Sequence, residues 1–214
     1  MVEEQELLKI RPQTLDDFSG QDKLKRLLGL TLEASKDREE VPPHILLHGP
    51  AGFGKTTLAY IIANGMGLTM LEVHAPSVEK SEELAAQLSS IRGACVVFVD
   101  EIHRLKKRIQ ESLYRTMEDF VVMHNDVLLQ MPKFSFIGAT TEFGTLTSPM
   151  RDRFGLVIAL TDYSDEEIGK IIARTSKVLQ IAITEDACEL IASRSRTTPR
   201  VANRLIATCR DVAQ

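Results

Sequence analysis

Glycine, lysine and threonine residues between Gly49 and Thr56 form a phosphate-binding pattern, Gly-Pro-Ala-Gly-Phe-Gly-Lys-Thr. A mostly apolar run precedes this pattern, and a run with helical character follows it. A buried strand, a glycine-rich turn and a helix start in that order are the context that a phosphate-binding loop requires. We therefore expect Gly49, Gly52 and Gly54 to bring backbone N–H groups close to an anion, beside the positive end of a helix dipole.

Two residues at the end of this pattern predict the chemistry of the bound group. Lys55 can reach the β and γ phosphates of ATP, and the Thr56 hydroxyl can ligate Mg²⁺. The alternative is a chance glycine-rich turn, but such a turn does not require the strand before it or the helix after it.

A carboxylate pair, Asp100-Glu101, ends the apolar run Val96–Val99. Ligands of open parallel sheets bind outside the carboxyl ends of the strands, so we expect this pair beside the phosphate-binding loop. Asp100 would hold Mg²⁺, directly or through water, and Glu101 would orient and polarise the water that attacks the γ phosphate. An apolar run ending in Asp-Glu is weak evidence alone, and it gains weight from the phosphate-binding loop upstream.

Other polar residues follow at positions where either a functional or an ordinary role fits. Thr140 and Thr141 end a further apolar run, where a hydroxyl could sense the γ phosphate or the attacking water. An ordinary turn threonine is the alternative. Arg151 and Arg153 lie in a polar loop and Arg200 opens a helix, so each is also explained as a solvated surface charge.

Composition is that of an ordinary soluble globular protein, with 43% hydrophobic and 26% charged residues among 214. The net charge of −4 argues against a chain that coats nucleic acid by itself. The three cysteines are scattered without metal or disulfide spacing, which indicates a reducing, cytoplasmic location. No apolar run approaches the ~18 residues of a membrane span, so we expect no membrane association.

Predicted strands and helices alternate as far as Leu160, which indicates a parallel α/β sheet with helices on both faces. The strands are expected at Ile45–Leu47, Thr69–Val73, Gly93–Asp100, Phe134–Ile137 and Gly155–Leu160. A compact hairpin is expected at Phe120–Met131 around Asn125-Asp126. Helical patterns without intervening strands follow at Ser164–Leu179, Thr184–Ser193 and Pro199–Ala213. We predict an α/β nucleotide-binding domain over residues 1–160 and a small helical domain over 161–214.

Longer segments of the chain resemble the RuvB family of AAA+ ATPases. The most specific are Asp-Glu-Ile-His-Arg-Leu from Asp100 and Thr-Pro-Arg-Val-Ala-Asn-Arg-Leu from Thr198. Others are Arg11-Pro12 with Gly20-Gln21, Gly49–Thr57, Met117–Phe120, Ile137–Thr141 and Ser148–Gly155. The match covers almost the whole chain. It implies a P-loop fold with a helical lid and a homo-oligomeric, hexameric ring. It also implies ATP hydrolysis with Mg²⁺ that drives DNA remodelling or Holliday junction branch migration in recombination and repair.

The resemblance also implies roles for individual residues. It implies nucleotide contacts at Ile10, Arg11, Gly49, Gly52, Gly54, Lys55, Thr56, Thr57, Glu118, Asp119, Phe120, Arg153, Tyr163 and Arg200. It implies catalytic roles for Lys55, Asp100, Glu101, Thr141, Arg153 and Arg200, with Thr56 and Asp100 at Mg²⁺. Thr141 corresponds to sensor 1, Arg200 to sensor 2, and Arg153 to an arginine finger that reaches the ATP of a neighbouring subunit.

Two departures from the family bear on partners. The family carries a long hairpin with a Gly-Pro-Ala-Ala tip that docks on RuvA. In this sequence only Val121–Met131 is available for the hairpin, which is therefore shorter and lacks that tip. We therefore expect weak or absent binding of a RuvA-like partner. The family also continues, after the position of Gln214, into a winged-helix domain that binds DNA.

Three functions compete at this point. A ring ATPase motor acting on DNA fits every catalytic position. A loader or assembly ATPase, which would use ATP to move a protein partner, is favoured by the short hairpin and the net negative charge. A regulatory nucleotide-binding module without turnover is disfavoured by Glu101 and Arg153. Stimulation of turnover by branched DNA or by a protein would separate the first two.

Overall fold

The computed structural model describes residues 10–213. The first nine residues of the predicted 1–160 domain, and Gln214 of the predicted 161–214 domain, lie outside the described residues. Five strands form one sheet in the order β2-β3-β6-β1-β7, and every neighbouring pair is parallel. They are β1 (Ile45–His48), β2 (Thr69–His74), β3 (Cys95–Asp100), β6 (Phe134–Thr140) and β7 (Leu156–Ala159). The predicted α/β class is confirmed, and the loops after β1, β3 and β6 leave the same edge of the sheet.

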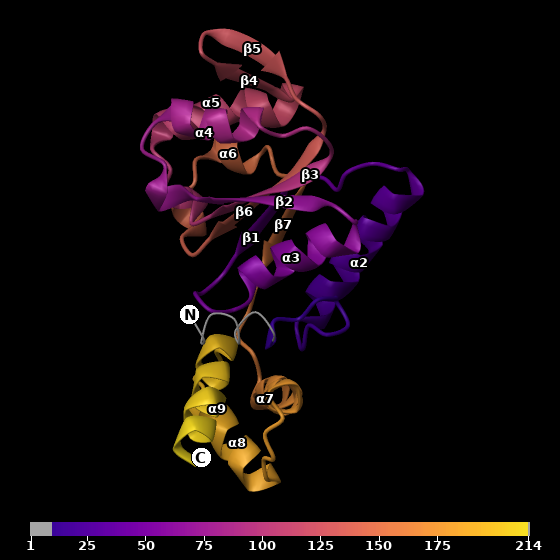
Figure 1. Ribbon diagram of the computed structural model, residues 1–214, viewed down its shortest axis with the longest axis vertical. Coiled ribbons are helices and arrows are strands. Elements are labelled where there is room, and N and C mark those ends of the chain that lie inside the picture. Colours follow the sequence, from indigo (N-terminus) through magenta and orange to yellow (C-terminus); the bar gives the residue numbers. More distant parts are fainter. Residues whose placement is uncertain (1–9, 214) are drawn as a thin grey trace.

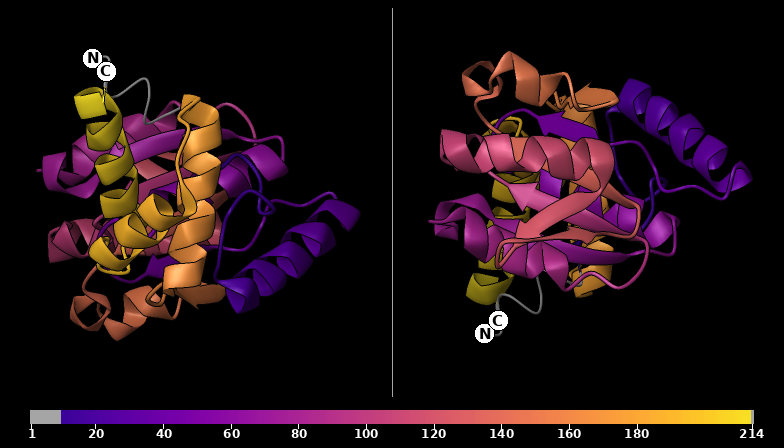
Figure 2. Two further views of the ribbon diagram at one scale, coloured as in Figure 1. Left: turned by 90° about the horizontal axis from the view of Figure 1, so that it is seen from below. Right: turned by 90° about the horizontal axis from the view of Figure 1, so that it is seen from above.

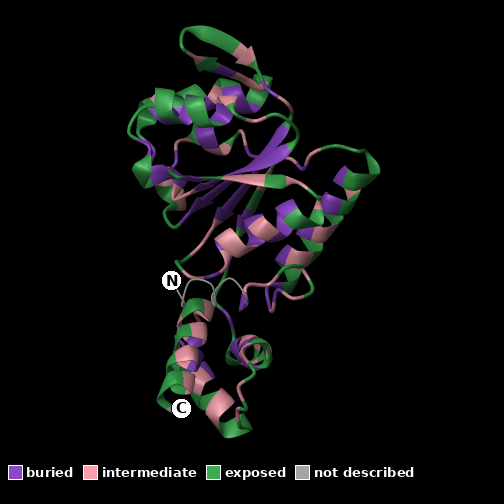
Figure 3. Ribbon diagram, viewed as in Figure 1, coloured by how far each residue is buried: buried purple, intermediate pink, exposed green. Residues whose placement is uncertain are grey.

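Helices cover both faces of the sheet, as Figure 1 shows. One face packs against α2 (Asp22–Asp37) and α3 (Lys55–Gly65), and the other against α4 (Ser81–Ser89), α5 (Lys107–Asp119) and α6 (Ser148–Arg151). Val96 and Phe98 of β3 belong to the first core, whereas Val97 and Val99 belong to the second. Strands buried on both faces are continuous apolar runs, which is why β3 and β6 are the most thoroughly buried strands in Figure 3.

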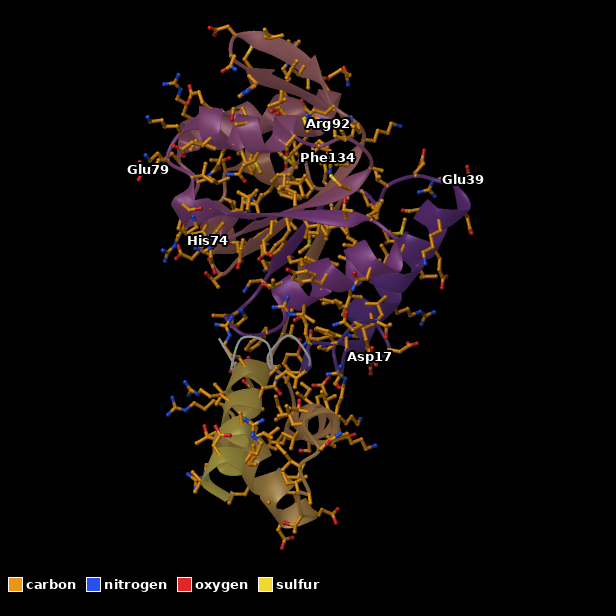
Figure 4. All side chains as sticks on the ribbon, viewed as in Figure 1. Asp17, Glu39, His74, Glu79, Arg92 and Phe134 are labelled. Carbon is orange, nitrogen blue, oxygen red and sulfur yellow. The ribbon has the colours of Figure 1, made fainter. Side chains whose placement is uncertain are left out.

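The predicted hairpin is confirmed as β4 (Val121–His124) and β5 (Val127–Gln130), an antiparallel pair. Its two turn residues, Asn125 and Asp126, have φ values of 49° and 58°. Asn and Asp tolerate this left-handed conformation, which matches the twist of a two-residue hairpin. The hairpin lies at the top of Figure 1, beyond α4 and α5, and Phe134 lies beneath those helices in Figure 4.

Three helices follow the sheet: α7 (Asp165–Leu179), α8 (Glu185–Arg194) and α9 (Pro199–Ala213). Each agrees with its predicted range to within a residue. Ser164 caps α7 in a reciprocal capping box with Glu167, which is the sequence signal that starts this helix. The three helices lie across the carboxyl end of the sheet, at the bottom of Figure 1 and nearest the viewer in the left panel of Figure 2.

A glutamine joins the two parts of the chain where the sheet ends. Gln21 Nε2 donates to the Thr161 carbonyl at 2.7 Å, and Gln21 Oε1 accepts from the Thr161 N–H at 3.2 Å. The backbone N–H of Gln21 donates to Glu167 of α7 at 3.1 Å. These contacts hold the start of α2 against the segment that leads into the last three helices. Among residues 10–213, no helix combines the length and the apolar character that crossing a membrane requires.

Candidate functional site

A cavity of about 380 Å³ lies between the carboxyl edge of the sheet and the last three helices. Its lining comes from the segment before α2, from the loops after β1 and β3, and from α7 and α9. The predicted site residues that line it are Ile10, Arg11, Gly52, Gly54, Lys55, Thr56, Thr57, Asp100, Glu101, Tyr163 and Arg200. Folding thus brings together most of the residues that the sequence singled out, from segments far apart in the chain.

The loop between β1 and α3 is shaped by two glycines with left-handed backbone angles. Gly52 has φ +84° and Gly54 has φ +101°, a region that other residues adopt only with strain. A Cβ on Gly52 would lie 2.9 Å from Cβ of Arg200, so the loop approaches α9 as closely as a glycine permits. Gly54 provides no side-chain cap for α3, which leaves the first N–H groups of this helix available to an anion.

Lys55 is buried beneath this loop. Its Nζ donates to the carbonyl of Gly49 at 2.7 Å and to that of Pro50 at 3.0 Å. Gly49 therefore shapes the site through its carbonyl, although it does not line the cavity. Burial lowers the pKa of Lys55, whereas the nearby carboxylates of Glu101 and Asp100 oppose that change. An ammonium group has three donors, so Lys55 keeps one for a phosphate oxygen.

Asp100 and Glu101 face the same cavity from the end of β3. Burial raises the pKa of Asp100, and a hydrogen bond from the Glu101 N–H to Asp100 Oδ1, at 3.0 Å, opposes the rise. Glu101 has a left-handed φ of 51° and turns away from the strand direction. The Thr141 hydroxyl donates to Glu101 Oε2 at 3.0 Å, whereas Thr140 contacts His103 at 2.9 Å. Of the two threonines, Thr141 is therefore the one joined to Glu101.

The donor set fits a magnesium ion shared with phosphates. Thr56 offers a hydroxyl and Asp100 a carboxylate, and both line the cavity. Mg²⁺ prefers oxygen ligands and is usually held by one or two carboxylates together with substrate phosphates and water. Within residues 10–213 there is no cluster of three His, Cys, Asp or Glu residues that would hold a metal alone. Bound there, Mg²⁺ would neutralise the charge that develops on the phosphates.

Three further contacts hold residues at the other end of the cavity in place. Tyr163 donates from its hydroxyl to the Phe53 carbonyl at 2.9 Å, and burial raises the pKa of Tyr163. Arg174 of α7 donates to the Ile10 carbonyl at 2.6 Å. The guanidinium of Arg11 lies 4.6 Å from the centre of the Tyr60 ring.

Several cavity residues were not predicted from the sequence. They are Pro12, Asp17, Phe18, Ser19, Ala51, Phe53, Ile171, Arg174, Thr175, Pro199 and Asn203. Asn203 lies within the family-like segment that begins at Thr198, which is a signal that could have singled it out. Arg174 has no such signal, because an arginine on an amphipathic helix reads as a solvated side chain. Asp17 is labelled in Figure 4, near the last three helices.

Six predicted residues do not line the cavity of their own chain. Gly49 and Thr141 contact Lys55 and Glu101, which do line it, and the other four lie farther along the chain. Glu118, Asp119 and Phe120 are at the end of α5 and do not line it, and neither does Arg153. Arg153 pairs with Glu118 at 3.1 Å, and its guanidinium lies 4.1 Å from the centre of the Tyr114 ring. The nucleotide contacts expected for Glu118–Phe120 stay a prediction, because these residues lie at the end of α5, where the chain turns into the hairpin.

The strand order, the phosphate-binding loop after β1, the acidic pair after β3 and the helices across the cavity define a P-loop domain of the AAA+ class, followed by its helical lid. Residues 10–160 match the model of the "Holliday junction DNA helicase RuvB P-loop domain", and residues 163–214 match the "RuvB AAA lid domain". The chain belongs to the RuvB family.

Relatives and solved structures agree with this family. The chain is 45% identical to the "Holliday junction branch migration complex subunit RuvB" of Kosmotoga olearia, over 99% of this chain and 64% of that protein. The protein of that name from Acholeplasma laidlawii is also 45% identical, over 97% of this chain and 64% of its own length. The structure of the Thermotoga maritima RuvB Holliday junction branch migration motor superposes with a TM-score of 0.87. It has 44% identity and covers 95% of this chain and 66% of that one. The chain thus spans just under two thirds of the relatives it matches.

The expectation of weak or absent binding to a RuvA-like partner finds no support. Both relatives are named as subunits of a branch migration complex and align with nearly the whole chain. The hairpin is present and exposes three large apolar side chains, Met123, Val127 and Leu128. The length of the hairpin tip alone therefore does not support the expected loss.

Proposed function

We propose that this chain is the ATP-hydrolysing part of a DNA branch migration motor, which works as a homo-oligomeric, hexameric ring. The observation that carries the proposal is the single cavity lined by Lys55, Thr56, Asp100, Glu101 and Arg200. These residues supply a phosphate ligand, a magnesium ligand set, a group to orient water and a second cation from the lid. The names of the relatives support DNA, in particular a Holliday junction, as the substrate that the motor moves.

Within one subunit, the residues would divide the work of phosphoryl transfer. Lys55 and the N–H groups of the loop bind the β and γ phosphates, and Thr56 and Asp100 hold Mg²⁺. Glu101 orients the attacking water, and the Thr141 hydroxyl at 3.0 Å holds this carboxylate in place. Arg200 enters from α9, so movement of the last three helices would follow the state of the nucleotide.

Arg153 would complete the site of a neighbouring subunit. It does not line the cavity of its own chain, which supports a role in trans. An arginine finger stabilises charge on the γ phosphate and contributes roughly 10³–10⁵ in rate. Glu118 is ion-paired with Arg153, so Glu118, Asp119 and Phe120 lie near the proposed finger. We propose that these three residues also face the nucleotide of the neighbour.

A protein partner would cover the exposed apolar side chains of the hairpin, in keeping with a subunit of a larger complex. We propose the cytoplasm as the location, because the DNA substrate of the relatives is handled there. A loader that moves only a protein partner is the second candidate, and the same hairpin surface is the feature that favours it. Branched DNA that fails to stimulate hydrolysis by the complete protein, while a partner protein does stimulate it, would favour the loader.

A mixing experiment tests the proposal. Lys55→Ala lacks only the nucleotide site, and Arg153→Ala lacks only the finger. Each variant alone should release phosphate at well under a hundredth of the wild-type rate. Mixed, they should regain partial activity, because some interfaces pair an intact Lys55 with an intact Arg153. A mixture that co-assembles by sedimentation yet stays as inactive as either variant would rule out the role of Arg153 in trans.

Binding of nucleotide is tested separately with a fluorescent ATP analogue. Lys55→Ala should lose binding, whereas Arg153→Ala should keep the wild-type affinity, since Arg153 lies outside the cavity of its own chain. Unchanged affinity in Lys55→Ala would contradict the assignment of the cavity to ATP.

A further inference from the structure

His103 contacts the carboxylate of Glu101, a residue that lines the cavity. It lies in the short 3₁₀ helix Ile102–Arg104, and its side chain is only 7% exposed. Its Nδ1 is 3.2 Å from Glu101 Oε2 and 2.9 Å from the Thr140 hydroxyl oxygen. Its Nε2 is 3.5 Å from Glu142 Oε1. His103 itself does not line the cavity, so it does not touch the nucleotide directly.

The hydrogen-bond partners around His103 determine what it can do. Glu101 has only acceptor atoms when ionised, so a bond between the two requires that Nδ1 carry the proton. The Thr140 oxygen accepts from the Glu142 N–H at 2.9 Å and can also accept from the same imidazole proton. Glu142 Oε1 is farther from the ring, at 3.5 Å from Nε2, so it competes for the single proton of a neutral imidazole less closely than the two oxygens beside Nδ1 do. The surroundings of His103 therefore orient a donor toward Glu101.

Two donors converge on one oxygen of Glu101. Oε2 accepts from the Thr141 hydroxyl at 3.0 Å and lies within reach of His103 Nδ1 at 3.2 Å. The other oxygen, Oε1, is then the one left to accept from the attacking water. A carboxylate on a flexible side chain gains catalytic precision when its surroundings fix its rotamer. The Thr141 hydroxyl, in the residue after β6, and His103 Nδ1, in the 3₁₀ helix after β3, provide that restraint.

We propose that His103 is a positioning residue, which holds Oε2 of Glu101 so that Oε1 faces the attacking water. The proposal rests on the proposed function, because it gives Glu101 its role in hydrolysis. A side chain that only fills space between β6 and the 3₁₀ helix would depend on the shape of His103. A positioning residue depends on the donor at Nδ1, and the two cases can be separated by substitution.

Three variants form a matched set. His103→Asn places an amide nitrogen near the position of Nδ1, whereas His103→Leu has nearly the shape of Asn and no donor. His103→Gln keeps a polar side chain but places its amide near the position of Nε2, facing Glu142. Each variant is compared with wild type in phosphate release across a range of ATP concentrations, in fluorescent ATP titration and in thermal unfolding.

The expected result is a selective loss of turnover. His103→Leu and His103→Gln should lower kcat by about 10- to 100-fold, the usual effect of losing one hydrogen bond to a charged group. KM and the ATP dissociation constant should stay within about twofold of wild type, because His103 lies outside the cavity. His103→Asn should recover most of the wild-type kcat. Since His103→Gln is polar, it gives a decisive comparison with His103→Asn even if His103→Leu folds poorly.

Two outcomes would overturn the proposal. One is a kcat for His103→Leu and His103→Gln equal to that of wild type, which would show that Thr141 alone holds Glu101. The other is an equal loss in all three variants, which would show that ring shape matters and the donor does not. Both outcomes leave ATP hydrolysis by this site intact. A wild-type protein that releases no phosphate would instead contradict the proposed function itself.

Discussion

Gln21→Met tests how the sheet and the last three helices are held together. Methionine has nearly the length and volume of glutamine but can neither donate nor accept the bonds that Gln21 makes to Thr161. The substitution would remove both partners of the Thr161 backbone. They are Gln21 Oε1, 3.2 Å from the Thr161 nitrogen, and Gln21 Nε2, 2.7 Å from the Thr161 carbonyl oxygen. The bond from the Gln21 backbone to Glu167 would remain, because it does not involve the side chain.

The size of the effect follows from the exposure of the two residues. A buried polar group that loses its partner costs about 1–3 kcal/mol. Thr161 is exposed, so water can replace part of each lost bond and the lower end of that range applies. Two backbone groups at about 1 kcal/mol each give a loss of about 2 kcal/mol in the free energy of unfolding.

Urea unfolding followed by circular dichroism measures this loss. Lys23→Met is the matched control. It introduces the same methionine at an exposed position in the first turn of α2, two residues after Gln21. The control should change the free energy of unfolding by less than about 0.5 kcal/mol. A loss for Gln21→Met no larger than that of the control would refute the reasoning, since the bonds to Thr161 would then contribute nothing measurable.

Three further predictions concern turnover, nucleotide affinity and pH. Glu101→Gln should bind ATP normally and hydrolyse it at least a hundredfold more slowly, because the amide cannot accept charge from the attacking water; wild-type phosphate release would show that another residue orients the water. Gly52→Ala should weaken fluorescent-ATP binding at least tenfold, since its Cβ would lie 2.9 Å from Arg200 Cβ. Gly67→Ala is the control, because Gly67 also has a positive φ, of +65°, but has open space around it, and this variant should keep the wild-type affinity. An equal loss of affinity in both variants would show that the clash with Arg200 is not the cause. Burial lowers the pKa of His44 in the folded state. The contribution of neutral His44 to the free energy of unfolding should therefore be constant above about pH 6.5. Below that pH the unfolded chain binds a proton first, so the free energy of unfolding should decrease by up to ~1.4 kcal/mol per pH unit. Urea unfolding at pH 7.5 and 5.5 should show a smaller fall for His44→Gln, and an equal fall would contradict this.

Local sequence patterns were enough to predict the strands and helices of the fold and the phosphate-binding part of the site. The strand, turn and helix around Gly49–Thr56 are specified by residues adjacent in sequence, so the sequence predicted them and the structure confirms them. Asp100 and Glu101 were predicted beside this loop because parallel strands end at a common edge, and both line the cavity. Helical periodicity from Ser164 onward likewise predicted α7, and the capping box of Ser164 with Glu167 is formed by residues of the same short segment.

Tertiary structure alone decided which distant side chains meet. The sequence left Arg153 as a solvated surface charge, whereas in the fold it forms an ion pair with Glu118 on α5. His103 stood in a family-like segment without an assigned role until folding placed it against Glu101 and Thr140. These contacts depend on how two elements cross in three dimensions. Hydrophobic periodicity specifies which face of an element is buried, but it does not specify which polar side chain lies opposite, so only the fold could determine these pairs.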